Sequence, residues 1–285
     1  MKERVCQFGP ERNLTGILTE PDAKDVHPDY PAVLMLNAGL LHRVGPHRMS
    51  FELAHRLAAC GYRGLRFDLG GLGDSESVGE ASHNANPALP DIKEAMDFLE
   101  RKHGARSFVL FGLCSGADNS FTAAIRDPRI VGVILLDGFG FWTVKSQIVH
   151  YLPRVFRPRV WIDLIRRRFS STQRSFEKDA LLRQQQLRRP FGTKPEVESA
   201  LHSLVARGTQ MLCFYTGGVE KYYNYANQFF DTFKGLKSRG AIQVEFCPNA
   251  DHTYTFAEDR ERMLTRVVEW IRSRNWNMPS GNSAR

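Results

Sequence analysis

The sequence lacks the features that mark membrane-spanning, exported and metal-binding proteins. No apolar run approaches the length of a membrane span, and the first ten residues, MKERVCQFGP, do not read as a secretory signal. We therefore expect a cytoplasmic protein without a transmembrane segment. The five cysteines, at positions 6, 60, 114, 213 and 247, show no CxxC spacing. Their odd number predicts reduced thiols rather than a disulfide framework or a zinc site.

Nucleotide-binding signatures are also missing. The glycine-rich turn Gly70-Gly71-Leu72-Gly73 has neither the GxGxxG register nor a Walker lysine. We expect a structural turn in which Asp68 and Ser75 hydrogen-bond the backbone. Neither an organic cofactor nor a metal is expected.

Buried strands alternate with amphipathic helices along most of the 285 residues. Two short strands are expected within 3–20, and further strands at 31–37, 64–68, 108–113, 130–136, 210–216 and 242–247. Helices are expected at 49–60, 91–103, 118–125, 224–237 and 259–274. This alternation is typical of an α/β fold with a mostly parallel central sheet flanked by helices. The length predicts a single domain over residues 1–285.

The chain is organised around the run FVLFGLCSGA at residues 108–117. It predicts a buried strand that turns sharply into a helix through Gly112-Leu113-Cys114-Ser115-Gly116. A nucleophile with glycines two positions before and after it forms a nucleophile elbow, where strand and helix backbones nearly touch and only glycine fits. Cys114 holds the central position, and Ser115 is out of frame. The motif resembles the elbow of the α/β-hydrolase superfamily, with a thiol as the nucleophile.

A thiol nucleophile needs a base, and the base needs an orienting carboxylate. In α/β-hydrolases the chain order is nucleophile, acid, histidine. His252 follows the last expected strand, so we expect it at the carboxyl edge of the sheet, where the elbow also opens. Glu220, after the strand at 210–216, is the preferred acid. Asp137, at the end of the preceding strand, is the alternative, because some family members take their acid from there.

The remaining requirement is an oxyanion hole. One donor is expected to be the backbone N–H of Ser115, at the N-terminus of the elbow helix. The other is expected to be the backbone N–H of Leu40, in the loop after the strand at 31–37. With these donors, Cys114 would attack an acyl carbonyl and form a covalent acyl-enzyme.

The resemblance extends over nearly the whole chain and looks like the serine-aminopeptidase-like or lysophospholipase-like branch of the superfamily. The cysteine elbow resembles that of dienelactone hydrolases. The signature Asn37-Ala38-Gly39 with Arg43-Val44-Gly45-Pro46 is more loosely similar to hydrolases of exosortase and exopolysaccharide gene clusters. The departures are Cys for Ser, Glu for Asp, and Ala38 for the usual His. The thiol points to activated esters, lactones or thioesters rather than peptides or lipids.

These observations predict a hydrolase of esterase or thioesterase type, acting through a Cys-His-Glu triad. One alternative is an acyltransferase or thioesterase that acts on an acyl group bound to a carrier protein or to coenzyme A. Another is a hydrolase-fold protein that binds a ligand without catalysis.

Residues 141–208 interrupt the strand–helix alternation where this superfamily inserts its cap, and we expect a helical cap there. The segment is basic and aromatic, as Arg166-Arg167-Arg168, Trp142 and Trp161 illustrate. It could be a solvated lid, a docking surface for an acidic partner such as acyl carrier protein or the phosphates of coenzyme A, or a contact to an anionic membrane or polysaccharide. Nucleic acid is not expected, because no recognition motif accompanies the basic residues.

Overall fold

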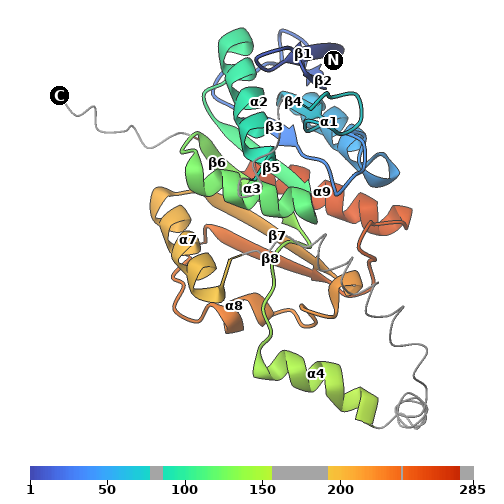
Figure 1. The fold of residues 1–285 in the computed structure, drawn as a ribbon, viewed down its shortest axis with the longest axis vertical. Helices are drawn as coiled ribbons and strands as arrows, with labels where there is room; N and C mark the ends of the chain where they lie inside the picture. The colour runs from blue at the N-terminus through green and yellow to red at the C-terminus, as the bar shows by residue number, and fades with distance from the viewer. Residues whose placement is uncertain (78–85, 156–191, 239, 277–285) are drawn as a thin grey trace, which may run out of the picture.

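An eight-stranded sheet forms the centre of the computed structural model, which describes residues 1–77, 86–155, 192–238 and 240–276 (Figure 1). The strands are β1 Lys2–Phe8, β2 Leu14–Glu20, β3 Ala32–Met35, β4 Gly64–Phe67, β5 Phe108–Leu113, β6 Ile130–Leu136, β7 Gln210–Thr216 and β8 Ile242–Cys247. Their order is β1-β2-β4-β3-β5-β6-β7-β8. β2 runs antiparallel to both of its neighbours, and every pair from β4 to β8 is parallel. The expected fold class is confirmed.

The described residues also form helices. They are α1 Met49–Ala59, α2 Ala88–His103, α3 Ser115–Arg126, α4 Val144–Val155, α7 Lys194–Arg207, α8 Gln228–Thr232 and α9 Ala257–Ser273. Two short 3₁₀ helices, Pro46–Arg48 and Gly217–Val219, lie in loops. Within the described ranges, no helix is both long enough and apolar enough to cross a membrane.

The core has two layers because neighbouring strand residues point to opposite faces of the sheet. Leu34 and Leu110 pack with side chains of α2, α3 and α7. Val33 and Val109 pack with side chains of α1 and α9 on the other face. Every residue of β3, β4 and β5 is buried, which explains why β3 and β5 read as continuous apolar runs. The two helical layers fix the carboxyl ends of these strands in place.

One expected helix is too long. The sequence suggests a helix over 224–237, but α8 covers only Gln228–Thr232. The Gln228 side chain accepts a 2.8 Å hydrogen bond from the backbone N–H of Asn224 and donates 2.7 Å to the carbonyl of Tyr222. These bonds hold the segment before α8 as a turn.

The region of the expected cap is described at its two ends. α4 projects from the body of the protein (Figure 1), while α7 packs into the core through Val197, Leu201 and Leu204. The C-terminal part of the segment 141–208 therefore belongs to the helical layer that covers the sheet. Residues 156–191, which carry most of the basic side chains expected of a cap, lie outside the described residues.

Candidate active site

The turn between β5 and α3 holds Cys114 in a strained backbone conformation. Its φ and ψ are 57° and −117°, a combination that non-glycine residues rarely adopt. A Cβ at Gly112 would lie 2.2 Å from the carbonyl carbon of Gly116, and a Cβ at Gly116 would lie 2.6 Å from the carbonyl oxygen of Asn37. No side chain fits at either glycine, and their absence lets the strand and the helix meet in a tight turn. Cys114 lies on this turn and is exposed.

His252 lies between Cys114 and Asp137. Its Nδ1 is 2.8 Å from Oδ2 of Asp137, and the Cys114 side chain lies close enough to contribute to the raised pKa of the ring. Asp137 directly follows β6, the neighbour of β5, and His252 lies in the loop between β8 and α9. Three segments far apart in sequence thus bring these side chains together at the carboxyl edge of the sheet.

The surroundings of His252 favour its charged form. The hydrogen bond with Asp137, and after it the interaction with the Cys114 side chain, raise the pKa of His252 to about 10, against the opposing effect of partial burial. Imidazole is therefore protonated at neutral pH in this arrangement. The site pairs a cationic ring with a buried carboxylate on one side and a sulfur on the other.

Asp137 is held firmly from the neighbouring strand. Its carboxylate accepts hydrogen bonds from the backbone N–H of Thr216 at 2.7 Å and from the Thr216 hydroxyl at 2.6 Å. Its own N–H donates to the carbonyl of Phe214 at 2.8 Å. The Asp137 side chain is fully buried. The carboxylate is thus fixed in one orientation toward His252.

Glu220, the preferred acid of the sequence analysis, is exposed and follows the 3₁₀ helix Gly217–Val219. The carboxylate at Nδ1 of His252 is that of Asp137, the alternative acid. The turn after β7 is instead packed against the His252 loop. A Cβ at Gly217 would lie 2.1 Å from the carbonyl oxygen of Pro248, and one at Gly218 would lie 2.5 Å from the backbone nitrogen of His252. The two adjacent glycines are the sequence signal that marks this turn as a backbone contact.

The loop after β3 lies against the elbow. We call residues 38–45 the oxyanion loop. The backbone N–H of Gly39 donates a 2.8 Å hydrogen bond to Oγ of Ser115, and the N–H of Leu41 donates to the carbonyl of Ala38 at 3.1 Å. Ser115 is the first residue of α3, where backbone amides have no acceptor within the helix. The two expected oxyanion donors, Leu40 and Ser115, therefore lie on segments that are hydrogen-bonded to each other.

Asp68 anchors the other side of the oxyanion loop. This buried residue follows β4 and accepts hydrogen bonds from the backbone N–H of Arg43 at 2.7 Å and from the Asn37 side chain at 2.9 Å. The Arg43 guanidinium pairs with both Asp68 and Asp74. Ser75 donates to the backbone carbonyl of Asp68 at 2.6 Å. The structural role expected for Asp68 and Ser75 is confirmed.

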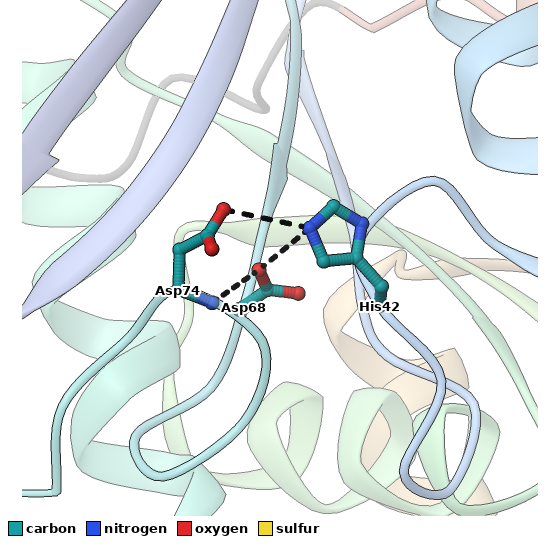
Figure 2. A group of neighbouring side chains, drawn as sticks. All are labelled: His42, Asp68 and Asp74. Atoms are coloured by element: carbon teal, nitrogen blue, oxygen red, sulfur yellow. Dashed lines mark hydrogen bonds and ion pairs between the residues drawn. The ribbon is translucent and has the colours of Figure 1, made fainter.

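Among the described residues, one group of side chains has the spacing of a metal site. Figure 2 shows His42, Asp68 and Asp74, whose ligand atoms lie within 4.8 Å of one another. Nε2 of His42 is 3.5 Å from Asp68 and 3.6 Å from Asp74. Both carboxylates already form ion pairs with the Arg43 guanidinium, whose Nη2 is 2.7 Å from Oδ2 of Asp74. We therefore assign this group to the anchoring of the oxyanion loop.

A strained elbow on the central strand and a histidine loop after the last strand define the α/β-hydrolase class. Within it, the family model described as "Serine aminopeptidase, S33" matches residues 38–208, which is more than half of the chain. The chain therefore belongs to this family. The comparison with curated proteins gave no match.

Solved structures share the fold at low sequence identity. An esterase from Pyrococcus furiosus is 14% identical, with a TM-score of 0.62 and coverage of 95% of this chain and 90% of that one. The esterase domain of a Rhodothermus marinus protein is 16% identical, with a TM-score of 0.56 and coverage of 95% and 98%. An α/β-hydrolase from a Penicillium species is 15% identical, with a TM-score of 0.57 and coverage of 95% and 98%. These likenesses concern the fold.

Proposed function

We propose that the protein is a cysteine-dependent esterase or thioesterase that forms an acyl-enzyme on Cys114. The observation that carries this proposal is the exposed thiol at a strained elbow, next to an imidazole that a buried carboxylate holds. The esterases among the solved structures of the same fold support the reaction class. The substrate class is an activated ester, a lactone or a thioester, whose leaving group a thiolate can displace.

Acylation begins with Cys114 as the thiolate, which an adjacent imidazolium favours. The sulfur attacks the carbonyl carbon and forms a C–S bond, and the carbonyl electron pair moves to the oxygen. The backbone amides of Leu40 and Ser115 stabilise this oxyanion. When the intermediate collapses, the bond to the leaving group breaks. Protonated His252 donates its proton to the leaving oxygen or sulfur.

Deacylation returns the enzyme to its starting state. Neutral His252 takes a proton from water, and the hydroxide attacks the thioester carbon of the acyl-enzyme. Collapse of the second tetrahedral intermediate releases the carboxylic acid and leaves the thiolate beside the imidazolium. Asp137 orients the ring in both half-reactions, a role for which its hydrogen bond to Nδ1 suits it better than exposed Glu220.

Two alternatives that the sequence left open differ from this proposal in their chemistry. An acyltransferase would share the first half-reaction and differ in the second, whereas a binding protein would carry out neither. In an acyltransferase, an alcohol or amine would replace water, and the acyl donor could be a carrier protein or coenzyme A bound to the basic cap. That contact falls on residues 156–191, outside the described residues. A binding protein without catalysis would form no acyl adduct.

The proposal is tested by intact-protein mass spectrometry after brief exposure to p-nitrophenyl acetate and to a small acyl thioester. We expect one acyl adduct in the wild type, none in Cys114→Ala, and an adduct that persists in His252→Ala because water is no longer activated. Cys60→Ala is the matched control, since Cys60 is a partly buried cysteine outside the site. Absence of an adduct, or an adduct that survives in Cys114→Ala, would contradict the proposal.

A second readout uses the different environments of the thiols. Burial raises the pKa of Cys213 to about 12, and the pKa of Cys6 and of Cys247 to about 11. These three thiols are therefore protonated at pH 8. Exposed Cys114 should react with iodoacetamide well before them, which peptide mapping would show. Equal labelling of Cys114 and Cys247 would contradict an activated nucleophile.

A further inference from the structure

The side chain of Ser115 makes a contact that the mechanism above does not use. Its Oγ accepts the backbone N–H of Gly39 at 2.8 Å, across 76 positions of sequence. The bond joins the oxyanion loop to the first residue of α3, directly after the nucleophile. One residue thus touches both halves of the expected oxyanion hole.

Side-chain packing contributes little to this part of the oxyanion loop. The Leu40 side chain is 81% exposed and that of Leu41 is 45% exposed. Gly39 has a φ of 58°, and a Cβ there would meet no atom within 4 Å. Among the described residues, apolar contacts therefore do little to fix the position of Leu40 on this side. The anchoring by Asp68 acts at Asn37, directly before the loop, and at Arg43 within it. The Asn37 side chain in turn donates to the carbonyl of Leu41 at 2.8 Å, which leaves the Gly39 side of Leu40 to be held by Ser115.

The hydrogen bond also determines which amide is left to bind substrate. The Gly39 N–H is taken by the Ser115 hydroxyl, and the Leu41 N–H is taken by the carbonyl of Ala38. Leu40, between them, is the residue whose amide the mechanism assigns to the oxyanion. Fixing the amides on both sides of Leu40 fixes its peptide plane, because the backbone has only two soft dihedrals per residue.

We infer that Ser115 is a positioning residue for the oxyanion hole, whose hydroxyl holds Gly39 so that the Leu40 amide points at the reacting carbonyl. Ser115 then serves the hole twice, by donating its own backbone N–H and by orienting the second donor through its side chain. This inference rests on the proposed acyl-enzyme mechanism.

Two reactions of the same thiol separate positioning from general damage to the elbow. Acylation by p-nitrophenyl acetate passes through a tetrahedral oxyanion and depends on the hole. Alkylation by iodoacetamide displaces iodide at an sp³ carbon and forms no oxyanion. Loss of an oxyanion donor should slow only the first reaction.

The experiment measures both rate constants on Cys114 in wild type, Ser115→Ala, Ser115→Thr and Ser120→Ala. We expect Ser115→Ala to lower the acylation rate about tenfold, less than the loss on removing a donor outright, and to change the alkylation rate less than about twofold. Ser115→Thr retains the hydroxyl and should restore acylation. Ser120→Ala removes a hydroxyl from the same helix, one that donates to the carbonyl of Gly116, and should leave both rates unchanged.

Each other outcome overturns the inference. Equal acylation rates in wild type and Ser115→Ala would mean that the hydroxyl does not position the loop. A parallel fall of both rates would mean that Ser115 only maintains the elbow. A threonine variant as slow as the alanine variant would exclude the hydroxyl as the cause. Failure of the wild type itself to form an acyl adduct on Cys114 would overturn the proposed function and this inference together.

Discussion

The backbone N–H of Cys114 donates a 2.9 Å hydrogen bond to the carbonyl oxygen of Leu136, the residue directly before Asp137. Cys114 and Asp137, the proposed nucleophile and the carboxylate proposed to orient its base, are thereby joined through the paired ends of β5 and β6. No long loop separates them, so their spacing depends on strand register rather than on loop conformation. The imidazole of His252 is the one member of the group that a loop must bring in.

Asp137→Asn should lower the turnover of a p-nitrophenyl ester on the order of 10³-fold, because an amide can hold the imidazole in the wrong tautomer and cannot stabilise imidazolium. Glu220→Gln is the matched control and should change turnover less than about threefold. Steady-state kinetics measures both variants, and thermal unfolding checks that each is folded. A larger loss in Glu220→Gln than in Asp137→Asn would reverse the assignment of the acid.

The free energy of unfolding should depend on pH because His252 binds its proton more tightly in the folded state. Its pKa is raised from 6.5 to about 10 by Asp137 and Cys114, so the folded state binds this proton more tightly than the unfolded state. The resulting stabilisation is complete below pH 6.5 and is lost as the pH rises toward 10. Guanidinium unfolding of wild type and His252→Asn should therefore give a stability difference that shrinks between pH 7 and 10. A constant or growing difference would contradict the ring's charged state.

Gly112→Ala should destabilise the protein by about 3 kcal/mol, because the added Cβ would lie 2.2 Å from backbone atoms of Gly116 and neither element can move freely. Gly235→Ala is the control, since a Cβ there meets only a carboxylate oxygen of Glu198 at 3.8 Å. That variant should stay within about 0.5 kcal/mol of the wild type. Urea unfolding measures both. Equal stability of the two variants would show that the elbow relaxes without cost.

Chelators should affect neither activity nor stability, because Arg43 supplies the positive charge beside Asp68 and Asp74. Dialysis against EDTA, followed by the ester assay and thermal unfolding, tests this expectation. Arg43→Met is the companion variant. It leaves the buried Asp68 carboxylate without its cation and should destabilise the protein by about 3 kcal/mol. A loss of activity on dialysis that Zn²⁺ restores would assign the His42 group to metal binding instead.

The strands of the sheet could be predicted well from the sequence, because the hydrophobic pattern that indicates a strand lies within the strand itself. β6, β7 and β8 match the expected ranges 130–136, 210–216 and 242–247. β6 and β7 are almost wholly buried and almost wholly apolar, whereas β8 is mostly half-buried and alternates apolar with polar residues, a pattern that also indicates a strand. The elbow could also be predicted from the sequence, because neighbouring backbone comes so close to positions 112 and 116 that only glycine fits there. Both signals are local in sequence.

The carboxylate partner of His252 and the packing of α7 could not be predicted from the sequence in the same way. Asp137 and Glu220 both follow a strand at the same edge of the sheet, and the choice between them depends on how the His252 loop packs on Gly217 and Gly218. The placement of α7 depends on its contact with the sheet's helical layer. Each is a tertiary contact between segments far apart in sequence, for which a single sequence contains no periodic pattern.

Gly217 and Gly218, which follow β7, also limit the positions at which a single substitution could place a new acidic side chain in the candidate active site. An acidic side chain introduced at Gly217 or Gly218 would meet the backbone of the histidine loop at 2.1 or 2.5 Å, so it would push away the very base that it was meant to serve. Positions 217 and 218 are therefore closed to a carboxylate as long as the histidine loop keeps this packing, and the acidic side chain at Nδ1 of His252 is supplied from the end of β6 instead.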